Sequence, residues 1–215
     1  MKAKLFVLIG VCWISLSAAC GQTSITYRFG ITSGVTASQI RIPLLSHSTD
    51  LLGRYTGGIS LEQRFTPAIA LIYQVSYTRL GGSSSGGGLS GSTPSITEYN
   101  YLILPVLLRI RSKGERGFIE VGGQLGYYLS GRSYTKGHEE QALAQQNVTK
   151  LDAGLSGGIG YQLGKHLVLD ARYYYGMRKI YADHSGPDPN TGLITFYRPV
   201  PEYHRVYSLQ LSYYF

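Results

Sequence analysis

The feature of this chain that most constrains its fold is a period-two alternation of apolar and polar residues, repeated in segments of about ten residues. In the last segment, Tyr207, Leu209 and Leu211 alternate with Ser208 and Gln210. A period of two places one set of side chains on each face of a β-strand. No long segment repeats apolar residues at helical spacing, so the sequence predicts an all-β protein.

Eight such segments follow one another, and the connections between them alternate in length. The connections near 66–67, 112–117 and 164–166 are short, whereas the others are long. An even number of strands with alternating short turns and long loops is typical of an eight-stranded antiparallel up-and-down barrel of the bacterial outer membrane. Pairing of the last strand with the first leaves no open sheet edge in lipid. The predicted strands are 24–33, 54–65, 68–80, 98–111, 118–131, 151–163, 167–179 and 206–215, and the predicted long loops are 34–53, 81–97, 132–150 and 181–203.

The polar face of the predicted strands distinguishes a membrane barrel from a soluble, lipocalin-like barrel. A soluble barrel exposes its polar face to water and carries many Lys and Glu residues there. All five lysines after residue 21 instead lie in turns, in loops or at strand ends. The polar face of the sixth predicted strand is made of small residues such as Gly154, Ser156 and Gly158. We therefore expect the apolar face to contact lipid and the polar face to fill the lumen.

The N-terminus has the pattern of a secretory signal peptide. Lys2 and Lys4 precede an apolar run over 5–19, which is shorter than the about 20 residues of a transmembrane helix. Small residues follow the run, and we predict cleavage after Gly21. This cleavage lowers the formal net charge from +8 to +6. The remaining excess is modest and dispersed, so it indicates no nucleic-acid partner and favours contact with anionic lipid headgroups.

The predicted cleavage divides the chain into a signal peptide over 1–21 and a barrel domain over 22–215. In an alternative interpretation, Cys20 becomes a lipidated first residue. Cys12 and Cys20 are the only cysteines of the chain. Removal of both excludes disulfides and thiolate chemistry from the barrel domain.

Eight charged side chains are expected to point into the lumen. Eight strands enclose a lumen that side chains can just fill, and charges buried there must pair. We predict an ion-pair network that acts as a structural plug; a narrow ion path or a proton relay is the alternative. The network consists of four acids and four bases, namely Arg28, Glu62, Arg64, Arg109, Glu120, Asp152, Asp170 and Arg172.

Four segments carry a resemblance to a known family. The segments YLILPVLLRIR (101–111), LDAGLSGGIGYQL (151–163) and LDARYYYGM (169–177), with the ending LQLSYYF, resemble the outer-membrane β-barrel domain family of Gram-negative envelopes, also called PorT-like. The resemblance spans most of the chain after residue 21, in strand order. It implies an OmpX-like barrel in the outer membrane of a Gram-negative bacterium.

The resemblance also implies a C-terminal assembly signal, which the barrel-assembly machinery reads during insertion. Its residues here are Tyr207, Leu209, Leu211, Tyr213 and Phe215. One position departs from the family pattern, because members often have an acidic residue where Ile103 stands in this chain. An interior polar contact made in relatives is therefore either missing or supplied by Glu120.

The loops contain few residues that suggest chemistry. The stretches Ser46–Asp50 and Asp183–Asp188 bring Ser, His and Asp together, as nucleophilic catalysis requires, but such residues are also common in exposed loops. His138, Glu139 and Glu140 are possible metal ligands, yet adjacent residues point in different directions. We therefore predict no catalytic site, no metal site and no cofactor.

Two glycine-rich stretches have structural explanations. The stretch 157–164 lacks the glycine spacing and strand–helix context of a dinucleotide-binding loop, and its glycines are expected to relieve crowding in a narrow barrel. The stretch 81–94 has the composition of a flexible linker.

Together these patterns predict a monomeric, non-enzymatic outer-membrane barrel that acts through its long extracellular loops. Its role would be binding, envelope integrity or assistance to secretion, with outer-membrane lipid and an unidentified extracellular or secretion partner as its contacts. Two alternatives remain open. One is a porin that passes small solutes, and the other is a lipid-modifying enzyme that uses His47 and His184.

Overall fold

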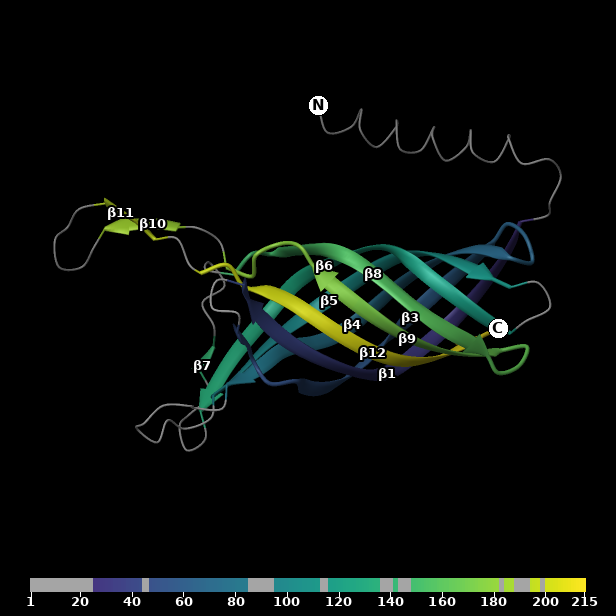
Figure 1. Ribbon diagram of the computed structural model, residues 1–215, viewed down its shortest axis with the longest axis horizontal. Helices are drawn as coiled ribbons and strands as arrows, with labels where there is room; N and C mark the ends of the chain where they lie inside the picture. Colours follow the sequence, from purple (N-terminus) through teal and green to yellow (C-terminus); the bar gives the residue numbers. More distant parts are fainter. Residues whose placement is uncertain are drawn as a thin grey trace, which may run out of the picture.

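The strands of the protein form one closed antiparallel barrel, which confirms the predicted fold. The computed structural model describes residues 25–43, 47–84, 95–112, 116–135, 141–142, 148–181, 184–187, 194–197 and 200–215. Figure 1 shows an elongated barrel of tilted strands. The eight strands of its wall are β1 (Thr26–Ile42), β3 (Leu52–Arg64), β4 (Ile69–Ser84), β5 (Ser95–Arg111), β6 (Gly117–Thr135), β8 (Leu151–Gln162), β9 (Leu167–Gly176) and β12 (Tyr203–Tyr214).

The last strand closes the barrel on the first. β12 pairs with β1 from Gly30↔Tyr214 to Arg41↔Tyr203, and β12 also pairs with β9. Both edges of the C-terminal strand are therefore hydrogen-bonded. Four further short strands lie outside this wall: β2 (His47–Ser48) pairs with β1, β7 (Gln141–Ala142) pairs with β6, and β10 (His184–Pro187) pairs with β11 (Ile194–Tyr197).

The two ends of the barrel differ in their connections. The short turns after β3, β5 and β8 lie at the same end as the C-terminus, which we call the turn end. At the β3–β4 turn, the Thr66 hydroxyl accepts hydrogen bonds from the backbone N–H groups of Ala68 and Ile69 at 3.3 and 3.0 Å. Strands β1, β4 and β6 end at the opposite end, the loop end, where Figure 1 also places β7, β10 and β11. In outer-membrane barrels the long loops are extracellular.

Several strands extend further toward the loop end than the sequence predicts. The first strand was expected to end at residue 33, but β1 continues to Ile42, and β4 and β6 continue to Ser84 and Thr135. The predicted long loops at 34–53, 81–97 and 132–150 are therefore partly wrong. Weak strand formers such as Gly34, Ser38 and Gly81 interrupt these extensions. The strand is stabilised there by pairing on both sides, as β1 pairs with β3 and β12.

The apolar face of the strands points outward, as predicted. Phe29, Ile159 and Tyr55 are 66%, 65% and 83% exposed on the outer surface. The alternating neighbours point into the lumen, where Glu62, Arg109 and Asp170 are almost fully buried. No helix in the described part of the chain has the length and apolarity of a membrane span.

Candidate functional site

The lumen near the turn end is filled by a cluster of paired charges. Glu62 on β3 is fully buried and is surrounded by four guanidinium groups. Its carboxylate oxygens lie 2.6 Å from Arg111, 3.1 Å from Arg64, 3.5 Å from Arg28 and 4.0 Å from Arg109. One carboxylate therefore holds cations from three strands, β1, β3 and β5, together.

A second carboxylate, Glu120 on β6, continues the cluster across the lumen. Its oxygens lie 2.6 Å from Arg109 Nη2 and 2.9 Å from Arg172 Nε. Arg172 also lies 2.7 Å from Asp170 on the same strand, β9. We call this set the charge layer; it comprises Arg28, Glu62, Arg64, Arg109, Arg111, Glu120, Asp170 and Arg172. Its five arginines and three acids join both sides of the barrel wall.

An aromatic ring and a glycine make room for the charge layer. The guanidinium of Arg109 lies 4.2 Å from the centre of the Phe118 ring. The same ring occupies the space beside Gly160, where an added β-carbon would lie only 2.2 Å from Phe118. Gly160 therefore relieves crowding in the narrow lumen, as expected for the glycines of β8.

Toward the loop end, the lumen is closed by a second cluster, in which aromatic rings pack with aliphatic side chains. The rings of Tyr99 and Tyr101 on β5 lie edge-on to His204 on β12, with centroids 5.6 and 5.4 Å apart. Tyr128 on β6 packs against both tyrosines at 6.3 and 5.8 Å. We call this set the aromatic layer; its buried members are Ile40, Leu80, Tyr99, Tyr101, Ile103, Tyr128, Val148, Tyr174, Ile180, His204 and Val206.

A small polar cavity separates the two layers. Its volume is about 30 Å³, and amides and hydroxyls such as those of Gln74, Ser156 and Gln210 line it. Gln74 donates to Gln210 at 2.9 Å and accepts from Arg172 at 2.8 Å. A cavity of this size holds one or two water molecules, so it is too small for a solute.

A third group of charges lies at the loop-end mouth of the lumen. Glu98 on β5 accepts hydrogen bonds from Arg54 Nε at 2.6 Å and from Arg132 Nε at 2.8 Å. Glu98 is almost fully buried, whereas both arginines are partly exposed. This triad joins β3, β5 and β6 above the aromatic layer.

Seven of the eight predicted network residues lie in the charge layer. The eighth, Asp152, also faces the lumen, but it lies in the aromatic layer beside Tyr101 and Tyr174. No ion pair joins it to the charge layer within the described residues. The structure adds Arg111, the last residue of the predicted strand 98–111, which contacts Glu62. Arg111 lies two residues after Arg109 on the same strand, and this alternation could have shown that its side chain points into the lumen.

The aromatic layer itself was also missed. Tyr99, Tyr101 and Ile103 share their parity with Arg109, and this signal places them all inside the barrel. Ile103, where relatives often have an acid, packs within the aromatic layer. Glu120 does not reach this level, because its carboxylate is bound to Arg109 and Arg172.

The residues of the predicted assembly signal line the outer face of β12. Tyr207, Leu209, Leu211, Tyr213 and Phe215 are between 40% and 71% exposed, with Phe215 the most exposed. The Phe215 N–H donates to the carbonyl of Phe29 at 2.8 Å, and its ring packs edge-on against Tyr213 at 5.3 Å.

The possible catalytic and metal-binding residues of the loops mostly lie outside the described part of the chain. This holds for Ser46, Asp183, His138 and its two neighbouring glutamates, and for the side chains of His47 and His184. Asp50 is described, and its backbone pairs with that of Ser83. Within the described ranges, no three His, Cys, Asp or Glu residues are placed to hold a metal ion.

A closed barrel with an apolar outer surface and a lumen of paired charges defines a transmembrane barrel of the outer-membrane type. The chain belongs to the outer membrane protein beta-barrel domain family, whose model matches residues 20–182. It is accordingly a protein of the outer membrane of a Gram-negative bacterium. A search of curated proteins finds no match.

Solved structures of outer-membrane proteins from several bacteria are similar to this chain. Neisserial surface protein A aligns with a TM-score of 0.54 at 13% identity, over 87% of this chain and 97% of that one. The attachment invasion locus protein Ail of Yersinia pestis (TM-score 0.47, 12% identity, 87% and 98% covered) and OprG of Pseudomonas aeruginosa (0.47, 15%, 90% and 98%) are also similar. At 13% identity, the likeness to Neisserial surface protein A shows the fold alone.

Proposed function

We propose that this protein is a non-conducting, non-enzymatic barrel that acts through its loop end, by binding a partner at the cell surface or by supporting the envelope. The observation that carries the proposal is the filled lumen. Two layers of buried side chains cross it, and the cavity between them measures about 30 Å³. A barrel closed at two levels offers its outer face and its loop end, and no passage, to other molecules.

The length of the strands supports a role for the loop end. β6 has 19 residues and β5 has 17. At roughly 3.3 Å per residue and a tilt of about 40°, 19 residues rise roughly 48 Å along the barrel, about twice the roughly 25 Å height of an apolar outer-membrane belt. Exposed apolar side chains of the outer face reach the turn end at Ile69, Ile110 and Ile119, so most of the excess strand length lies at the loop end.

A filled lumen argues against a solute-passing porin. In planar lipid bilayers, the mature protein is expected to give no step-like conductance, whereas a porin added to the same bilayer gives steps. Heat-modifiable migration in gels shows that the barrel in the preparation has folded. Step-like conductance from such a folded preparation would overturn the proposal.

The role of the loop end is tested by complementation in a strain that lacks the gene. The readout is outer-membrane permeability to a large antibiotic and survival in bile salts. We expect the wild-type gene to restore the barrier, and we expect a gene in which a Gly-Ser linker replaces 182–199 to fail.

The His47→Ala and His184→Ala variants should restore the barrier fully, because no catalysis is involved. Failure of the histidine variants alone, together with a lost lipid modification, would favour the enzyme alternative.

A further inference from the structure

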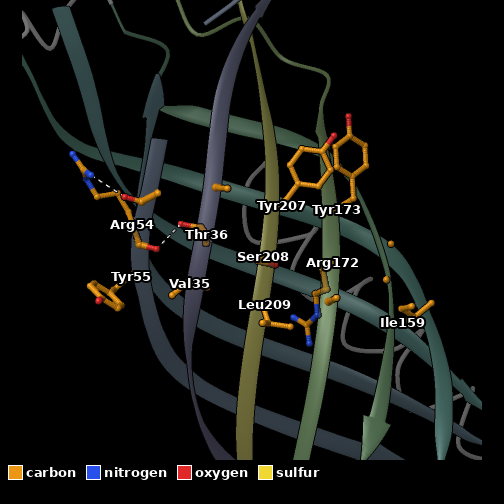
Figure 2. A pocket seen from close by; sticks show the side chains of 15 residues that line it. Val35, Thr36, Arg54, Tyr55, Ile159, Arg172, Tyr173, Tyr207, Ser208 and Leu209 are labelled. Carbon is orange, nitrogen blue, oxygen red and sulfur yellow. Dashed lines mark hydrogen bonds between the residues drawn. The ribbon is translucent and has the colours of Figure 1, made fainter. Parts of the chain in front are cut away.

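The outer face of the barrel has a groove where five adjacent strands meet, β3, β1, β12, β9 and β8. The groove has a volume of about 760 Å³, which is in the range of small-molecule sites. Figure 2 shows it from close by, with the rings of Tyr207 and Tyr173 on one side and Leu209 and Ile159 on another. These side chains are exposed on the lipid-facing surface, so the groove opens toward the membrane.

The groove exists because small residues interrupt the row of large ones. Across the strands, Gly53 is the register partner of Ala37, which in turn pairs with Tyr207. The same row continues through Tyr173 to Gly157. A β-carbon added at Gly53 would have no atom within 4 Å. This row therefore has no large side chain at Gly53 and Ala37, on β3 and β1, or at Gly157 on β8. Large apolar side chains border both of these gaps.

Cationic residues stand directly above the groove, toward the loop end. The next outward row contains Gln39, which pairs with Arg205, and the row after it contains Arg41, which pairs with Tyr203. Arg41 and Arg205 are diagonal neighbours on the outer face, roughly 7–8 Å apart. Both lie on the loop-end side of the row that contains Tyr207 and Tyr173.

The two arginines have different surroundings. Arg41 is exposed. Arg205 is only 5% exposed, because its guanidinium lies 3.6 Å from the centre of the outward-facing Tyr175 ring and its Nη1 donates to the carbonyls of Gly176 and His204 at 2.7 and 2.8 Å. Arg205 is thus a fixed positive charge, whereas Arg41 can reach an anionic group directly.

We infer that this groove binds one phosphorylated lipid of the outer leaflet. Its acyl chain lies in the gap over Gly53 and Ala37, beside Tyr207. Its phosphate lies at Arg41, near the fixed charge of Arg205. The loop end faces the outside of the cell, so the cationic rows lie in the outer leaflet. A groove filled by an acyl chain gains van der Waals contacts that a flat barrel surface does not offer. The positive charge supplies the preference for a phosphorylated headgroup.

The test measures the affinity of lipid A for the full-length mature protein in detergent micelles, by native mass spectrometry. A phosphate-free form of the same lipid is titrated in parallel. We expect lipid A to bind more tightly, and we expect Arg41→Gln to weaken lipid A about fivefold while leaving the phosphate-free form unchanged. Gly53→Leu fills the groove and is expected to weaken both lipids about threefold.

Matched controls separate a site from general attraction to lipid. Arg79 on β4 is another exposed arginine whose parity places it on the outer face near the loop end, and Gly123 on β6 is another outward glycine with no atom near its added β-carbon. Arg79→Gln and Gly123→Leu should leave both affinities unchanged. Equal losses in Arg41→Gln and Arg79→Gln, or no loss in Gly53→Leu, would overturn the inference. Displacement of the lipid by inorganic phosphate alone would overturn the role of the acyl chain.

Discussion

At the scale of single residues, the charge layer depends on one carboxylate more than on any other. Glu62 is fully buried and faces four arginines, whereas the other two acids of the layer face fewer. Removal of one partner from a buried ion cluster leaves uncompensated charges in a medium of low dielectric constant. The layer is a structural plug in this interpretation, and its stability can be measured.

We predict that Glu62→Gln lowers the free energy of unfolding by about 3 kcal/mol, because four guanidinium groups, two of them buried, lose their shared carboxylate. The measurement is urea unfolding of the protein in lipid vesicles. The fraction of folded protein is followed by tyrosine fluorescence or by the migration of unheated samples in gels. The double variant Glu62→Gln, Arg111→Gln should recover part of the loss, because it removes one of the unpaired charges.

The same substitution at Glu202 is a suitable control. Glu202 precedes β12 at the loop end, and burial raises the pKa of its carboxyl group. No ion pair joins it to the described residues, so Glu202→Gln is expected to change stability by less than about 0.5 kcal/mol. Equal effects at both positions would show that the arginine cluster does not stabilise the barrel.

At the scale of elements, β12 is the strand that closes the barrel and also carries the proposed assembly signal. Its inward residues pack in the lumen, where Tyr214 is buried under the guanidinium of Arg28 at 4.8 Å. Its outward residues, and Phe215 directly after its end, are exposed on the lipid-facing surface. We therefore expect the assembly machinery to recognise the outward side chains at the end of this strand.

We predict that Phe215→Ala reduces the amount of barrel in the outer membrane several-fold in cells, because the machinery loses its terminal aromatic residue. The unfolding midpoint of the same variant, refolded in vesicles, should change little, since the ring is 71% exposed. Leu163→Ala removes another exposed apolar side chain at the turn end and should leave the cellular level unchanged. A matching loss of stability in Phe215→Ala would mean that the residue acts in the folded barrel instead.

At the scale of the whole molecule, closure of the lumen is redundant. The charge layer and the aromatic layer each cross the barrel, and they share no residue. An eight-stranded barrel is narrow enough that either layer alone fills its cross-section. Opening one layer should therefore leave the barrel closed.

We predict that Tyr99→Ser with Tyr101→Ser, or Arg109→Ser with Phe118→Ser, gives no conductance in planar bilayers, whereas the four substitutions together produce steps. Heat-modifiable migration of each variant confirms that the barrel has formed before conductance is recorded. Conductance from either pair alone would show that the remaining layer is not a seal.

The sequence by itself determined the number of strands, their inward and outward faces and their antiparallel closure. These features follow from a local rule, because the period of two decides the direction of every side chain once a strand is recognised. The rule also places Tyr99, Tyr101 and Arg111 in the lumen, although these residues were recognised only in the structure. Strand ends were harder to predict, since Ser38 and other weak strand formers of β1 are held by pairing with β3 and β12.

Only the tertiary structure decided which interior residues meet. Glu62 and Arg111 are 49 positions apart and lie 2.6 Å from each other, while Asp152, of the same inward parity, lies in the other layer. The height of a residue in the lumen depends on the register and tilt of its strand, which accumulate around the barrel. For the same reason, the outer groove and its arginines come from five strands, and no local pattern in the sequence brings them together.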